Sequence, residues 1–128
     1  MIPSRLLRGL YRPGSLRTET GAVVFEIENR FSNVELLRLR SLAIDQVRVP
    51  PERVLLALEH AAPRRAADIV PVRPLRVRVG ERLRVRAEGV AAAPGTHRVD
   101  LAFDTAPFGM LVFDVTDRSS EAPGGAFP

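Results

Sequence analysis

Apolar and polar residues alternate along much of this chain with a period of two, which is typical of strands that bury one face. Residues 22–30 (AVVFEIENR) show the pattern: Val23, Phe25 and Ile27 fall on one face, and two glutamates fall on the other. Proline and glycine separate such segments at intervals of about ten to twelve residues. The pattern predicts an all-β fold, an antiparallel β-sandwich or a small barrel. We favour a β-sandwich of about seven to nine short strands with almost no helix.

One long segment, 34–49 (VELLRLRSLAIDQVRV), could also be interpreted as an amphipathic helix. Alternation of Leu37 and Leu39 with arginines, and the proline pair that follows at 50–51, favour strands instead. Asp45 and Gln46 would form the turn between them. The other expected elements are a short strand at 14–17, a single turn at 51–53, a strand at 54–59, at most one helical turn at 65–69, and strands at 97–105 and 108–116. We expect one domain over 1–117 and a flexible tail over 118–128.

Residues 75–89 (LRVRVGERLRVRAEG) place apolar and basic residues in alternation on both sides of Gly80-Glu81-Arg82. This symmetry predicts a β-hairpin in which Val79 lies opposite Leu83 on the core face. Arginines would then face one another across the ladder, Arg78 opposite Arg84 and Arg76 opposite Arg86. Like charges in that arrangement are unfavourable by several tenths of a kcal/mol per pair.

Three environments could accommodate this arginine face. It could be solvated, it could pair with Asp100 and Asp104 of the next expected strand, or it could contact another protein. Arginine suits the last role because its planar guanidinium binds carboxylates and is weakly hydrated. The residues that we predict for a partner interface are Arg76, Arg78, Arg84, Arg86 and Tyr11.

Composition narrows the classes of function. The 128 residues carry a net charge of +4, and all 19 basic residues are arginine, interspersed with 15 acidic ones. An alkaline isoelectric point of this origin is a weak sign of nucleic-acid binding, which we consider unlikely. The absence of cysteine excludes disulfides, a thiol nucleophile and cysteine-based metal sites. Neither a membrane span nor a signal peptide is expected, so the expected location is cytoplasmic.

Few residues are candidates for chemistry. His60 and His97 each lack a second ligand at a metal-binding spacing. Asp100 and Asp104 would lie about 13 Å apart on one strand, too far to act on one bond. We therefore expect no catalytic, cofactor-binding or metal-binding residue in this chain.

Several phrases together resemble the small β subunit of bacterial C-glycoside deglycosidases, over about Tyr11 to Asp117. The phrases are RPGSLR at 12–17, FEIENR at 25–30, AID at 43–45 followed by VPPERV at 49–54, VGERLRVRAEG at 79–89 and PGTHRVDLAFDTAPFG at 94–109.

The resemblance implies a non-catalytic subunit of a heteromeric carbon–carbon lyase that cleaves C-glycosides of 3-oxo sugars. Its partner would be a larger, sugar-isomerase-like TIM-barrel α subunit that holds a divalent metal, Mn or Mg. An aromatic C-glycoside substrate would bind at or near the shared site. The turn at Gln46-Val47 departs from the family, which often has glycine there. The main alternative is a stand-alone β-sandwich that binds a protein or a ligand.

Overall fold

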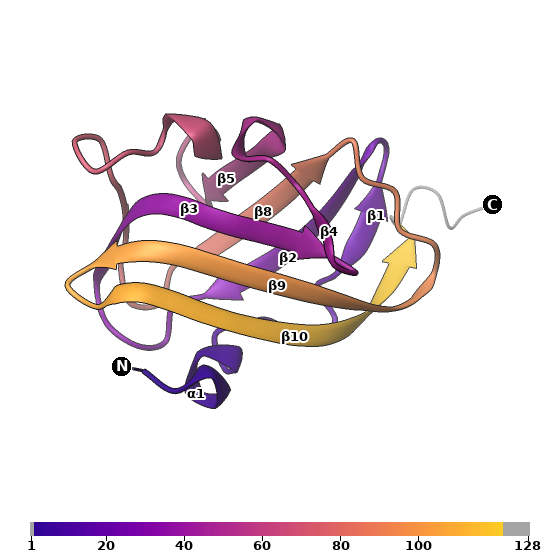
Figure 1. Ribbon diagram of the computed structural model, residues 1–128, viewed down its shortest axis with the longest axis horizontal. Coiled ribbons are helices and arrows are strands. Elements are labelled where there is room, and N and C mark those ends of the chain that lie inside the picture. Colours follow the sequence, from indigo (N-terminus) through magenta and orange to yellow (C-terminus); the bar gives the residue numbers. More distant parts are fainter. Residues whose placement is uncertain (1, 122–128) are drawn as a thin grey trace.

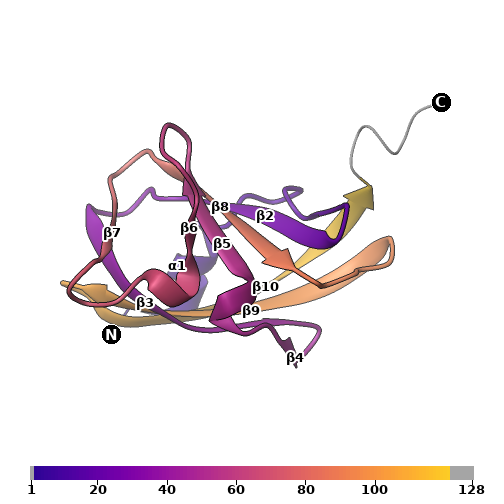
Figure 2. The same cartoon turned by 90° about the horizontal axis from the view of Figure 1, so that it is seen from above.

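Two β-sheets face each other and enclose the apolar core, as Figures 1 and 2 show. The computed structural model describes residues 2–121, with side chains as far as Ser119. Its ten strands confirm the predicted β-sandwich. The number slightly exceeds the seven to nine expected, and two of the ten, β4 (Val47–Arg48) and β6 (Arg64–Arg65), are only two residues long. Within the described residues, no helix is long and apolar enough to cross a membrane.

Sheet A has the order β1–β2–β8–β5–β6, and sheet B places β9 between β3 and β10. Both short strands β4 and β7 pair with β3 in sheet B. Sheet A consists of β1 (Arg17–Glu19), β2 (Ala22–Glu28), β5 (Val54–Leu58), β6 (Arg64–Arg65) and β8 (Arg82–Glu88). Sheet B consists of β3 (Val34–Ile44), β4 (Val47–Arg48), β7 (Leu75–Val77), β9 (Gly95–Ala106) and β10 (Gly109–Glu121).

Strand β10 belongs to both sheets. It runs antiparallel to β9 as far as Ser119, and its last two residues then pair in parallel with β1. Residues 118–121 are therefore part of a strand, and the predicted tail begins too early. Alternation of apolar residues ends at Val115, so the sequence pattern carries no sign of this continuation. The rest of the predicted tail, 122–128, lies outside the described residues.

Turn chemistry explains several boundaries. Asp45 and Gln46 have φ values of 50° and 68°, the left-handed conformation that a two-residue hairpin between β3 and β4 requires. This confirms the predicted turn. The single turns expected near 51–53 and 65–69 are the 3₁₀ helices η1 (Pro51–Arg53) and η2 (Ala66–Asp68).

The predicted hairpin at 75–89 is wrong. Strand β7 pairs with β3 in sheet B, whereas β8 pairs with β2 and β5 in sheet A. The connection 78–81 therefore crosses between the sheets. It is fixed to the end of β2, because Gly80 N–H donates to the carbonyl of Asn29 (2.7 Å) and Asn29 N–H donates to that of Glu81 (2.9 Å). Alternation specifies which face of a strand is buried and does not specify the neighbouring strand.

Two features near the start of the chain also differ from the sequence expectation. A short helix, α1 (Ser4–Arg8), packs against β10 and buries Leu7. Its position is fixed by Arg8, whose Nε donates to the carbonyl of Asp114 (2.8 Å). The first strand begins at Arg17 rather than 14, since Asp117 accepts hydrogen bonds from the backbone N–H groups of Gly14 and Leu16.

Candidate functional site

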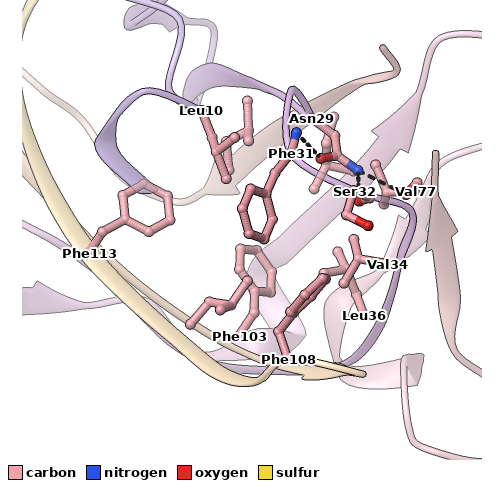
Figure 3. A pocket seen from close by; sticks show the side chains of 13 residues that line it. Leu10, Asn29, Phe31, Ser32, Val34, Leu36, Val77, Phe103, Phe108 and Phe113 are labelled. Carbon is pink, nitrogen blue, oxygen red and sulfur yellow. Dashed lines mark hydrogen bonds between the residues drawn. The ribbon is translucent and has the colours of Figure 1, made fainter. Parts of the chain in front are cut away.

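An apolar pocket of about 60 Å³ opens into the core at one end of the sandwich. Figure 3 shows it between the loop that follows β2 and the turn between β9 and β10. The lining residues are Leu10, Ile27, Asn29, Phe31, Ser32, Val34, Leu36, Val77, Leu83, Phe103, Phe108, Leu111 and Phe113.

Phe31 is the most prominent residue of the pocket. Its side chain is 48% exposed, and in Figure 3 its ring lies between Leu10 and Phe113 on one side and Phe108 on the other. The rings of Phe31 and Phe108 are tilted, with centroids 5.1 Å apart. Phe31 therefore covers part of the pocket and remains accessible from outside. An aromatic residue within the polar loop NRFSN is the sequence signal that could have identified Phe31, which is not among the predicted site residues.

Asn29 is the polar residue that the pocket buries most deeply, with 6% exposure. Its Nδ2 donates to the carbonyls of Ser32 (2.8 Å) and Val77 (3.0 Å), and its Oδ1 accepts from the N–H of Phe31 (3.1 Å). These bonds use both amide hydrogens and the carbonyl. Asn29 thus fixes the loop that carries Phe31 and is satisfied without a ligand.

The size and chemistry of the pocket limit what it can bind. Sites for small organic ligands usually measure about 300–1,000 Å³, and this pocket is several times smaller. One apolar side chain from another protein is a better match for such a volume. Anchoring residues at protein interfaces commonly insert into small apolar pockets of this kind.

The structure does not bring the four predicted interface arginines together. Arg84 and Arg86 extend from the outer face of sheet A, where they contact Glu26 (3.4 Å) and Glu19 (2.8 Å). Arg76 contacts Glu35 in sheet B at 3.1 Å. Arg78 lies exposed in the connection between the sheets.

The aspartates considered as internal partners of these arginines have other partners. Asp100 accepts hydrogen bonds from Arg98, and Asp104 accepts two from Arg40 (2.9 and 3.0 Å). The possible pairing of the arginines of 75–89 with these aspartates does not occur. Strand β8 belongs to sheet A and β9 to sheet B, and Arg76 of β7 contacts Glu35 instead. Whether the arginines contact a partner stays a prediction.

Tyr11 lies in the core with only 5% exposure. Its ring packs against Phe25 with centroids 5.7 Å apart, and its hydroxyl donates to Asp117 (2.8 Å). Burial, together with the hydrogen bond to Asp117, raises the pKa of the Tyr11 hydroxyl far above its usual range. Tyr11 therefore joins the N-terminal segment to β10, and its ring offers almost no surface to a partner.

The two histidines have different surroundings. His60 is exposed and lies 3.5 Å from Glu59. His97 is largely enclosed, with Nδ1 at 2.5 Å from Asp45 Oδ2 and Nε2 at 2.6 Å from the carbonyl of Ala93. Both of its partners are acceptors, so only the imidazolium can donate to both. These contacts, first with Ala93 and then with Asp45, raise the pKa of His97.

The acidic and histidine side chains are scattered over the molecule. Over the part of the chain that the structure describes, there is no group of three histidine, cysteine, aspartate or glutamate side chains that could hold a metal ion.

Comparison with known proteins corrects the resemblance noted in the sequence. The family model that matches the chain is described as hydroxymethylglutaryl-CoA reductase, N-terminal domain, and the match covers residues 6–120. No curated protein matches the chain.

The assignment to the β subunit of C-glycoside deglycosidases is therefore wrong. All the phrases on which it rested lie inside the matched segment, and they are strand and turn sequences that different sandwiches can share. The carbon–carbon lyase activity, the barrel-shaped partner and its metal stay untested predictions that the family match does not support. The chain belongs to the family of the hydroxymethylglutaryl-CoA reductase N-terminal domain.

Proposed function

We propose that this chain is a non-catalytic interaction domain that binds a catalytic protein partner through the apolar pocket. The observation that carries the proposal is Phe31, which is about half exposed above a small apolar pocket. A partner side chain inserted beside Phe31 would be surrounded by the rings of Phe108 and Phe113. Aromatic residues in such positions often contribute much of the affinity of an interface.

The loop that carries Phe31 is held in place before any partner binds. Asn29 fixes it through three hydrogen bonds, and Asn33 Oδ1 accepts from the N–H of Val79 (2.9 Å) in the neighbouring connection. A fixed loop loses little conformational entropy on association, which favours affinity. The pocket is therefore suited to accept a side chain without rearrangement of its polar wall.

The family description supports a catalytic partner. It names a domain of hydroxymethylglutaryl-CoA reductase, an enzyme with further parts, so a domain of this family would act beside a catalytic portion. The partner that we propose is the catalytic portion of a reductase of that kind. Binding of a small ligand is a weaker alternative, because the pocket is several times smaller than usual ligand sites.

Isothermal titration calorimetry of the purified chain with the hydroxymethylglutaryl-CoA reductase catalytic domain of the same genome tests the proposal. We expect saturable binding that Phe31→Ala weakens by at least about tenfold, since loss of a central aromatic anchor commonly costs about 2 kcal/mol or more. Val47→Ala is the matched control. Val47 is an exposed apolar residue of β4, and Figure 1 shows β4 at the opposite end of sheet B from the turn between β9 and β10, which borders the pocket.

Two outcomes would contradict the proposal. One is the absence of heat from binding by the wild-type chain at concentrations where both proteins stay folded. The other is an equal loss of affinity in Phe31→Ala and Val47→Ala. Thermal melting of each variant shows whether the fold is retained.

A further inference from the structure

The outer face of sheet A carries an unusual set of ion pairs in which arginines outnumber carboxylates two to one. Each of three glutamates on this face contacts two guanidinium groups. The contacts are Glu19 with Arg17 (2.8 Å) and Arg86 (2.8 Å), Glu26 with Arg12 (2.6 Å) and Arg84 (3.4 Å), and Glu28 with Arg30 (3.3 Å) and Arg82 (3.6 Å).

This arrangement concentrates positive charge on one face. Six guanidiniums share three carboxylates, which leaves an excess of three positive charges. The whole chain has a net charge of only +4. A further pair on the face, Arg65 with Glu88 (2.8 Å), is balanced and does not change the excess. If Glu59, at the edge of the sheet, is counted as part of the face, the excess falls from three charges to two. The contact of Glu59 in this structure is with His60.

The glutamates of the face are more fully engaged than its arginines. Glu19 and Glu26 each accept hydrogen bonds from two guanidinium groups, and Glu28 lies within 3.6 Å of two more. A guanidinium group has five N–H donors and uses few of them here. Arg84 also keeps 56% of its side chain exposed. The groups on this face that remain available to a ligand are therefore mainly positively charged guanidinium N–H donors.

Two hollows on this face each present a pair of guanidiniums. One, of about 330 Å³, is lined by Arg82 and Arg84 together with residues at the end of β5, Glu59 among them. The other, of about 250 Å³, is lined by Arg12 and Arg17 around the loop 13–15. Glu26 borders both hollows.

The distance between the two hollows is set by the spacing of the strands in sheet A. Arg12 N–H donates to the carbonyl of Glu26 along one edge of β2, and β8, which carries Arg84, lies along the other edge. Adjacent strands are about 4.8 Å apart, so the two segments are separated by about 10 Å. Two carboxylates of one short peptide segment can span that distance.

We propose that the outer face of sheet A docks an acidic protein segment whose carboxylates enter the two hollows. Guanidinium groups bind carboxylates with two parallel hydrogen bonds, and the shared glutamates already restrict the arginines on this face. A protein segment fits better than single-stranded nucleic acid, because the described side chains of this face include no aromatic ring on which a base could stack.

This surface is separate from the apolar pocket, and either proposal can fail without the other. The probe for it is a fluorescently labelled hexaglutamate peptide, titrated with the wild-type chain in buffer of low ionic strength and followed by fluorescence anisotropy. Arg12→Gln combined with Arg84→Gln should weaken binding by at least about tenfold, since hydrogen bonds to charged groups are worth about 1.5–3 kcal/mol each. Phe31→Ala should leave peptide binding unchanged.

The matched control removes the same charge from sheet B. Arg38 and Arg40 share Asp104 there, and Arg40 is exposed to a similar degree as Arg84, 52% against 56%. Arg38→Gln combined with Arg40→Gln should change the affinity by less than about threefold, because only the general attraction of net charge is reduced. If the double variant in sheet A does not fold, Arg84→Gln alone should still weaken binding more than Arg40→Gln alone.

A single-stranded DNA oligonucleotide of the same net charge separates the two classes of partner. The proposal expects the DNA to bind more weakly than hexaglutamate. It would be overturned by tighter DNA binding that depends on Arg12 and Arg84, by equal losses in the sheet A and sheet B variants, or by the absence of saturable peptide binding.

Discussion

The outer faces of the two sheets use arginine in different ways. On sheet A, six arginines share three glutamates. On sheet B, four arginines contact three aspartates, so the charges nearly balance. Asp100 and Asp114 even lie directly opposite each other on β9 and β10, and Arg98 contacts both, at 3.0 and 3.8 Å.

Side-chain length explains a second difference. On sheet A, Val24 lies between Arg17 and Arg86 on the neighbouring strands, and long side chains cover it until none of its surface is exposed. On sheet B, Val112 lies beside Ala102 and keeps 46% of its surface exposed. Arginine stems can bury apolar surface while their charged ends stay in water. The arginines of sheet A thus contribute to the stability of the fold, whether or not they also bind a partner.

Substitution of these two valines should give the largest difference in stability between the two faces. Val24→Ala should lower the free energy of unfolding by about 2 kcal/mol, because a fully buried side chain loses apolar contacts and leaves a cavity. Val112→Ala should change it by less than about 0.5 kcal/mol, as is usual for exposed sites. Urea denaturation of both variants gives the comparison, and equal losses would show that the arginine stems do not shield Val24.

Removal of one shared carboxylate from each face should have a smaller effect. In Glu26→Gln, Arg12 and Arg84 lose their common partner, and the excess charge of the face rises. We expect a loss of about 1 kcal/mol at low ionic strength that decreases as salt is added. Asp104→Asn on the more balanced face should cost about half as much. Denaturation at two salt concentrations measures both, and a salt-independent loss in Glu26→Gln would indicate that repulsion between the arginines is unimportant.

Acid should act on the same glutamate. Burial by itself raises the pKa of Glu26, but the hydrogen bond and charge of Arg12 and the charge of Arg84 outweigh this and lower the pKa overall. A lowered pKa in the folded state means that the stabilisation is present above the ordinary glutamate range and is lost as the pH falls. The difference between wild type and Glu26→Gln should therefore shrink in acid.

The smallest expected effect concerns His97, near one end of sheet B. Its raised pKa means that its stabilising contribution is complete below the ordinary histidine range and is lost as the pH rises through the pKa of the folded state. Wild type should be more stable at about pH 5.5 than at about pH 8 relative to His97→Gln, by less than about 1 kcal/mol, as for other surface ion pairs. Denaturation of both proteins at the two pH values tests this. A pH difference of the same size in His97→Gln would assign it to other groups.

Most strands could be predicted from local sequence. The prediction fails where contacts between segments far apart in the chain determine the structure. Alternation and turn residues located β2, β3, β9 and the turn at Asp45-Gln46, because each of these depends on neighbouring residues. The crossing at 78–81 could not be distinguished from a hairpin, since its backbone bonds go to Asn29, far away in the sequence. Helix α1 is only five residues long, and its contacts with β10 stabilise it rather than its own propensity.

The candidate sites were less predictable than the fold. The arginine-rich segment is visible in the sequence, but Arg84 and Arg86 contact glutamates of β2 and β1, and Arg76 contacts Glu35 of β3, rather than Asp100 and Asp104. Sheet membership depends on the crossing, which the sequence pattern does not reveal. Tyr11 was predicted for a partner interface, yet its ring is buried and its hydroxyl donates to Asp117, 106 positions away in the chain. Phe31 lies outside any alternating pattern, so a search based on periodicity does not select it.

A strand shared by both layers has a mechanical consequence. Because β10 pairs with β9 along most of its length and then with β1, one continuous backbone links sheet B to sheet A. The layers cannot slide past each other unless this strand loses hydrogen bonds to one of its neighbours. If a protein bound at the pocket pulls on the turn between β9 and β10, near Phe108, the force would pass along β10 into sheet A. The two sheets would then resist shear as one unit.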